Sequence, residues 1–129
     1  MINYGFTKEI DTSFDETVDN ATNELKKEGF GILTQVDVTE KFAEKLGIDF
    51  KKYIILGACN PPKAFEALQY ENKIGTMLPC NVIVQELDDG KTEVAAVNPV
   101  ASMLAVDNRD LTEVANEIEE KLQRVIHAL

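Results

Sequence analysis

Residues 53–62 read Tyr-Ile-Ile-Leu-Gly-Ala-Cys-Asn-Pro-Pro, and this stretch decides the fold. Its first part, from Tyr53 to Ala58, is apolar at odd and even positions alike, which is typical of an interior strand. Asn60 then suits the N-cap of a helix, and the prolines after it suit the first helical turn. We therefore predict a buried strand that ends where a helix, running to about Tyr70, begins.

Toward the C-terminus, two strand patterns lie at residues 80–87 and 92–97. The Asp89-Gly90 pair between them is a hairpin signal. Residues 98–108 are predicted to form a loop that carries the apolar Met103 and Leu104. Asp110, with Glu113 three residues later, is predicted to open the last helix. Its apolar face consists of Leu111, Val114, Ile118, Leu122, Val125 and Leu129.

Toward the N-terminus, residues 3–10 are predicted to form a strand, and Ser13 with Glu16 forms a capping box for a helix that ends at Gly29. A strand is expected over residues 30–38. One face of it should carry Phe30, Ile32, Val36 and Val38, and the other Gln35 and Asp37. Thr39 is expected to cap a short helix that buries Phe42 and Leu46 and ends at Gly47.

The predicted order of elements is β-α-β-(short α)-β-α-β-β-α. Few of the strand pairs are joined by a full crossover helix, so a doubly wound parallel sheet is disfavoured. The 129 residues fit a single domain over residues 1–129. The expected fold class is α+β, a two-layer fold with a mainly antiparallel sheet and helices on one face.

The charge of the chain disfavours several kinds of partner. Thirteen basic against 23 acidic residues give a net charge of −10, which repels the phosphates of nucleic acids and of anionic membranes. No stretch approaches the ~20 apolar residues that span a bilayer. The N-terminus also lacks a signal-peptide profile, so we expect a cytoplasmic protein whose two cysteines are reduced.

No catalytic motif is found in the sequence. The glycine-rich loops of nucleotide folds and the Gly-x-Ser-x-Gly elbow of hydrolases are absent. His127 is the single histidine, and we expect it at the surface near the end of the last helix. A catalytic triad or a multi-histidine metal site therefore cannot form within one chain. We expect no cofactor.

The two cysteines of the chain each precede an asparagine, in Cys59-Asn60 and Cys80-Asn81, and these four residues are the candidate ligand or redox site. If their strands are antiparallel neighbours, the thiols approach one another. A helix N-terminus can lower the pKa of a thiol such as Cys59, and Cys80 could then resolve the oxidised form. Two thiolates can also bind Cu(I) or zinc. The simplest interpretation is that both are small apolar core residues, as many free cysteines are.

These segments resemble the family catalogued as domain of unknown function 302. The resemblance lies in residues 29–34 (Gly-Phe-Gly-Ile-Leu-Thr), 36–38, 45–47, 49–50, 55–62, 64, 67–68, 74–75 and 78–82. It implies a compact β-α-β-β-β-β-α fold similar to that of the TATA-binding protein, and it implies no activity or cofactor. Gln35 and Asn98 depart from the pattern, which commonly has acidic residues there.

Three functional hypotheses remain open, in this order. The first is a homodimeric binding module that holds a small apolar or anionic ligand near the Cys-Asn pairs. The apolar loop residues Met77, Leu78, Met103 and Leu104 would then line a pocket or a subunit contact, or else fold back over the sheet edge. The second is a thiol redox protein that uses Cys59 and Cys80. The third is a soft-metal site shared by the thiols of two chains.

Overall fold

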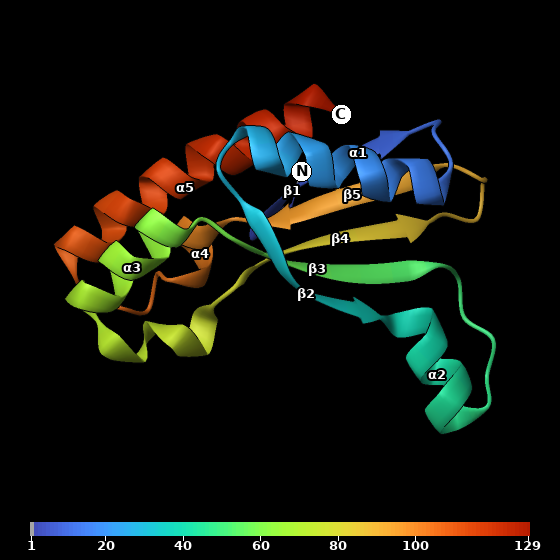
Figure 1. The fold of residues 1–129 in the computed structure, drawn as a ribbon, viewed down its shortest axis with the longest axis horizontal. Coiled ribbons are helices and arrows are strands. Elements are labelled where there is room, and N and C mark those ends of the chain that lie inside the picture. The colour runs from blue at the N-terminus through green and yellow to red at the C-terminus, as the bar shows by residue number, and fades with distance from the viewer. Residues whose placement is uncertain (1) are drawn as a thin grey trace.

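The computed structural model describes residues 2–129. Figure 1 shows the chain as one sheet with its helices. The elements in chain order are β1 (Gly5–Ile10), α1 (Phe14–Lys27), β2 (Gly31–Asp37), α2 (Val38–Leu46), β3 (Tyr53–Cys59), α3 (Pro61–Tyr70), the 3-10 helix η1 (Asn72–Met77), β4 (Cys80–Glu86), β5 (Thr92–Val97), α4 (Pro99–Ser102) and α5 (Arg109–Ala128).

The five strands form one sheet in the order β1-β5-β4-β3-β2, and every neighbouring pair is antiparallel. The strand over residues 53–58 is confirmed as an interior strand, because β3 lies between β4 and β2. The α+β class and the antiparallel sheet are confirmed, with α2, α3 and α4 added to the basic β-α-β-β-β-β-α order.

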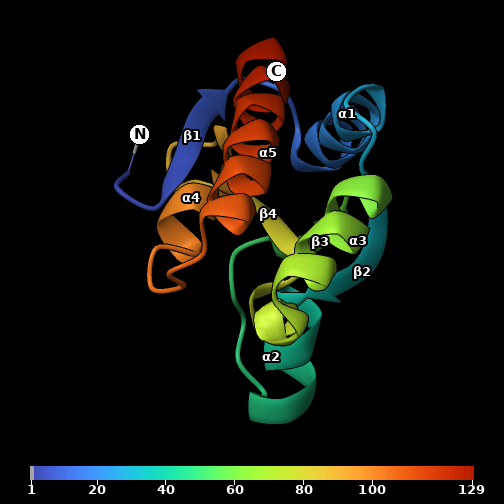
Figure 2. The same ribbon diagram turned by 90° about the vertical axis from the view of Figure 1, so that its left-hand side faces the viewer.

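Helices α1 and α5 run along one face of the sheet, and α3 and α4 lie beside the start of α5 at one end of the strands (Figures 1 and 2). Alternate residues of the strands point toward these helices and are buried, such as Leu56, Val82 and Val94. The apolar stripe of α5, which includes Leu111 and Leu122, packs against them. This face of the sheet holds the hydrophobic core.

The opposite face, which we call the open face, carries the remaining strand residues. Many of them are half-buried, namely Thr7, Tyr53, Ile55, Ile83, Gln85, Glu93, Ala95 and Val97. The face therefore mixes aliphatic and polar side chains. Strand β3 is apolar on both sides: Tyr53 and Ile55 lie on this open face, whereas Leu56 and Ala58 lie in the core.

The predicted faces of β2 are wrong because the strand contains a β-bulge. Ile32 pairs with Ala58 on the core side, but Thr34 pairs with Gly57 and Val36 pairs with Ile55 on the open side. The extra residue, Leu33, shifts the alternation by one. Ile32 and Val36 therefore point to opposite faces.

The prediction for the short helix α2 is partly wrong. The helix ends at Gly47 as expected, but the side chain of Asp37, not Thr39, caps its start. No residue of α2 is fully buried, and Leu46 is 64% exposed. Figure 1 shows the reason: α2 stands apart from the other helices at the end of β2. Phe42 packs on Phe50 instead, with ring centroids 5.1 Å apart.

Two further boundaries differ from the prediction. Residues 98–108 contain the short helix α4, which Asn98 caps by accepting hydrogen bonds from the next turn. Asn108, not Asp110, caps α5, and its side chain accepts from the main-chain N–H of Leu111. Asp110 lies in the first turn, where a carboxylate also stabilises the helix.

Candidate functional site

Both cysteines lie beside one apolar cavity between the sheet and the helices. Ala58 is paired with Cys80 across β3 and β4, so Cys59, the next residue of β3, is adjacent to Cys80. The cavity has a volume of about 290 Å³. We call it the Cys pocket, and it is lined by Cys59, Cys80, Phe30, Leu33, Ala58, Asn60, Ala64, Ala67, Leu68, Leu78, Pro79, Met103, Val114 and Ile118.

The environment of the thiols favours their protonated form. Burial raises the pKa of Cys59, which is half-buried. Burial, with a smaller contribution from the neighbouring Cys59, raises the pKa of Cys80 to about 11. Loss of hydration disfavours the thiolate, because an anion loses more hydration free energy in an apolar site than a neutral thiol does. At neutral pH both groups are therefore poorer nucleophiles than a free cysteine.

Asn60 is buried, and both the nitrogen and the oxygen of its side-chain amide form hydrogen bonds. Its Nδ2 donates to the main-chain oxygen of Glu28 at 3.2 Å, and its Oδ1 accepts from the main-chain N–H of Lys63 at 3.4 Å. The predicted N-cap is confirmed. Asn60 thus joins the start of α3 to the end of α1 and leaves little of its amide for a ligand.

The start of α3 is a poor anion site. Pro61 and Pro62 carry no N–H, and the N–H groups of Lys63 and Ala64 bind the side chain and the main chain of Asn60. The donors that usually hold an anion at a helix N-terminus are therefore missing or occupied.

Asn81 lies away from the other three candidates. It follows Cys80 in β4 and pairs with Gly57, so its side chain projects from the open face. It is exposed and lines a shallow groove there, with Tyr53 and Ile83 among its neighbours. The structure thus brings Cys59, Asn60 and Cys80 together and separates Asn81 from them.

The apolar loops supply part of the pocket. Leu78 and Met103 line it, while Met77 and Leu104 remain exposed. Leu33 from β2, Ala64 from α3 and Ile118 from α5 also line the pocket, but the sequence did not predict them as site residues, because these elements meet only in the folded chain. Their apolar periodicity gave the only signal, and it is the same signal that any core residue gives.

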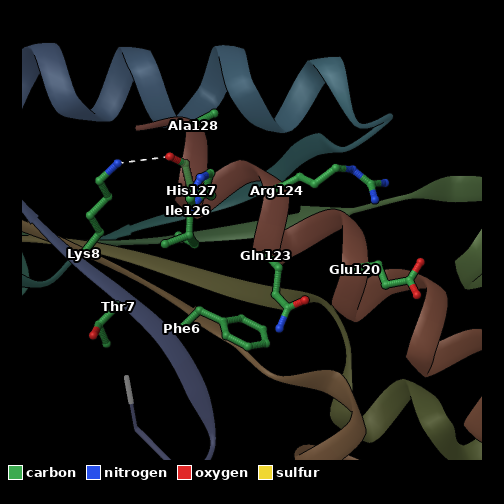
Figure 3. Close-up of a pocket in the computed structure, with 9 residues that line it drawn as sticks. All are labelled: Phe6, Thr7, Lys8, Glu120, Gln123, Arg124, Ile126, His127 and Ala128. Atoms are coloured by element: carbon green, nitrogen blue, oxygen red, sulfur yellow. Dashed lines mark hydrogen bonds between the residues drawn. The ribbon is translucent and has the colours of Figure 1, made fainter.

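A second, wider hollow lies between β1 and α5 and has a structural explanation. Figure 3 shows Lys8 reaching toward the end of α5. Its Nζ donates to the main-chain oxygens of His127 at 3.1 Å and Leu129 at 2.9 Å. It therefore satisfies carbonyls that a helix C-terminus leaves unpaired. His127 is exposed near the end of the last helix, as predicted.

Two features are absent from the part of the chain that the structure describes. Residues 2–129 contain no group of three or more His, Cys, Asp or Glu side chains arranged to hold a metal ion. Nor does any helix within them have the length and apolar character needed to cross a membrane.

Comparisons with known proteins identify the family of the chain. The family model described as "Domain of unknown function DUF302" matches residues 6–129. The crystal structure of an uncharacterized conserved DUF302 protein from Bacillus stearothermophilus is similar, with a TM-score of 0.90 and 33% identity over 98% of each chain. Comparison with curated proteins finds no match. The chain belongs to the family of domain of unknown function DUF302.

Proposed function

We propose that the protein is a binding module that holds a small, uncharged, apolar molecule in the Cys pocket. The observation that carries the proposal is a cavity of about 290 Å³ whose walls are almost entirely apolar. Native interiors are packed to high density, and voids larger than a water molecule are few. Such a cavity lowers the stability of the fold unless a ligand occupies it.

The size of the cavity sets the size of the ligand. A cavity of roughly 150 Å³ lined by Leu, Ile and Phe stays dry and accepts benzene. The Cys pocket is about 290 Å³, which suits an aromatic molecule of two or three rings or a short aliphatic molecule. The half-buried Cys59 also lines the cavity, and its polarisable sulfur atom makes favourable contacts with the same ligands.

Two leucines supply an entrance. Leu33 is 65% exposed and Leu68 is 38% exposed, yet both also line the cavity. Leu33 is the extra residue of the β2 bulge, which turns its side chain out of the regular alternation. A ligand would enter between β2 and α3, at these two side chains.

An apolar ligand is better supported than the anionic ligand that the sequence left open. The amide of Asn60 is bonded at both ends, and the first N–H groups of α3 are missing or occupied. A buried carboxylate or phosphate would therefore lose its hydration without gaining hydrogen bonds in return.

The redox and metal hypotheses remain predictions with weaker support. A redox role needs a thiolate at neutral pH, and burial raises the pKa of both Cys59 and Cys80. A shared metal site needs the thiols of two chains to meet, and these thiols line an interior cavity. A cytoplasmic location and a homodimer also remain predictions.

The uncharged fluorescent probe N-phenyl-1-naphthylamine tests the proposal. Its emission rises in an apolar site, so a titration of the full chain should show saturable binding. Ala64→Leu adds bulk inside the pocket, whereas Gln69→Leu places a leucine at an exposed position of α3 outside it. We expect A64L to weaken binding by at least about tenfold and Q69L to leave it unchanged. No saturable binding, or equal binding by A64L, would overturn the proposal.

A further inference from the structure

The apolar surface that α3 contributes to the Cys pocket continues beyond the mouth of the pocket. Successive residues of a helix turn by about 100°, so four apolar residues follow one another around α3 in the order Ala67, Ala64, Leu68, Phe65. We call them the α3 stripe. Ala67 is 2% exposed and Ala64 is half-buried, whereas Leu68 is 38% and Phe65 is 68% exposed. The stripe therefore leads from the interior of the protein to the solvent.

The other side of the mouth is apolar as well. Leu33 on β2 lines the pocket and is 65% exposed. A surface helix usually carries polar side chains where it meets solvent, but Leu68 and Phe65 are apolar there. Exposed apolar surface of this kind often marks a binding site. Here it is continuous with a cavity, so the surface that a ligand can cover is larger than the cavity itself.

The interior of the pocket has little to offer a polar group. Its walls are almost entirely apolar, and the side-chain nitrogen and oxygen of Asn60 already form hydrogen bonds. A polar group placed among these walls would lose its hydration and gain no hydrogen bond in return. Any polar group of a ligand must therefore remain at the mouth, in water.

We infer that the ligand is a single-chain amphiphile. Its alkyl chain fills the Cys pocket and continues over Leu68 and Phe65, and its uncharged polar head stays in water beyond them. This inference rests on the proposed function and names the class of molecule that the pocket takes. An anionic head is disfavoured, because the protein has a net charge of −10.

The size of the cavity indicates how much of the chain lies inside. A rounded cavity of about 290 Å³ is roughly 8 Å across, and an extended chain advances about 1.2 Å per bond. A hexyl chain therefore fits inside the pocket. A decyl chain is longer than the pocket, so its outer carbons lie on the exposed part of the α3 stripe.

Two series of compounds test the inference: hexyl, octyl and decyl glucoside, and the alcohols with the same alkyl chains. Displacement of N-phenyl-1-naphthylamine from the full chain, below the critical micelle concentrations, measures their affinities. We expect a gain of about fourfold per methylene from hexyl to octyl in both series, because each methylene leaves water. Each glucoside should bind within about threefold of its alcohol, because the head keeps its hydration.

A substitution outside the cavity tests the path of the chain. Phe65→Gln should weaken the binding of decyl glucoside by about threefold or more and leave hexyl glucoside unchanged, because only the longer chain reaches this side chain. Tyr70→Gln is the matched control, since Tyr70 is 41% exposed and lies on another side of α3. It should leave the binding of both glucosides unchanged.

The outcomes separate this inference from the proposed function. Glucosides that bind more than about tenfold more weakly than their alcohols would show that the ligand is wholly enclosed. That result, or an equal effect of Phe65→Gln on the hexyl and decyl compounds, would overturn the amphiphile and leave the apolar pocket standing. No binding of N-phenyl-1-naphthylamine, the alcohols or the glucosides would overturn both.

Discussion

The side chain of Asn60 donates a hydrogen bond of 3.2 Å to the main-chain oxygen of Glu28, which lies 32 positions earlier in the chain. This bond joins the start of α3 to the turn after α1. Gly29 has φ +86° in that turn, and a Cβ at Gly29 would lie 3.1 Å from the Asn60 amide nitrogen. The turn and the asparagine therefore fit one another closely.

Replacing asparagine with alanine should lower the free energy of unfolding in one Cys-Asn pair and not in the other. Asn60→Ala removes a helix cap and leaves the Glu28 oxygen without its bond, so we expect a loss of about 1–3 kcal/mol in the free energy of unfolding. Asn81→Ala is the matched control, because Asn81 is exposed, and its effect should stay within about 0.5 kcal/mol. Urea denaturation of both variants measures this. Equal losses would show that Asn60 has no special structural role.

Gly57 should not tolerate a side chain. A Cβ at Gly57 would overlap Thr34 Oγ1 and lie 2.8 Å from Pro79 Cγ, whereas a Cβ at Gly75 would have no neighbour within 4 Å. We expect Gly57→Ala to lower the free energy of unfolding by about 1–3 kcal/mol. Gly75→Ala should be neutral or slightly stabilising. Thermal unfolding of the two variants compares them, and a neutral Gly57→Ala would refute this account of the β2–β3 contact.

Helix α2 should contribute little to the core. Leu46 is 64% exposed, whereas Leu122 on α5 is fully buried. Leu46→Ala should change the free energy of unfolding by no more than about 0.5 kcal/mol, and Leu122→Ala should lower it by about 2–5 kcal/mol. Chemical denaturation distinguishes these outcomes. A large loss in Leu46→Ala would favour the original expectation of a buried α2 face.

Local patterns predicted much of this fold. The Asn60 cap, the Asp89-Gly90 hairpin and the apolar stripe of α5 depend on neighbours in the sequence, and the structure has all three. The adjacency of Cys59 and Cys80 could also be expected, because it follows from antiparallel pairing of their strands.

The remaining features depend on contacts between distant residues. The bulge at Leu33 is visible only in the pairing of β2 with β3, and it reversed the predicted face of Val36. The exposure of Leu46 follows from the position of α2 beyond the sheet, which its helical periodicity does not reveal. The Cys pocket likewise forms from β2, β3, β4, α3, α5 and two loops, and no short motif marks its lining beyond Cys59, Asn60 and Cys80.

Stability should fall at alkaline pH through Cys80. Burial raises the pKa of its thiol to about 11 in the folded state, while the unfolded thiol titrates near its ordinary value. At a pH between these two pKa values, the Cys80 thiol is deprotonated in the unfolded state and protonated in the folded state. The free energy of unfolding therefore decreases as pH rises. The loss should reach on the order of 2 kcal/mol by about pH 11.

The comparison of wild type with Cys80→Ala isolates this effect, because lysine and tyrosine titrations are common to both. Urea denaturation at a series of pH values above 8, roughly where free thiols begin to ionise, should show a steeper fall for the wild type. Parallel curves would mean that Cys80 is not held protonated by burial.

Xenon binding in a crystal of the protein tests the central claim, an apolar and accessible Cys pocket, most directly. Xenon enters dry apolar cavities and avoids polar hydrated ones. We predict a xenon peak within the pocket, in contact with Ala67, Leu78 and Met103, and no peak in the wide, solvent-open hollow between β1 and α5. Ordered waters in the Cys pocket and no xenon there would contradict the proposal that it holds an apolar ligand.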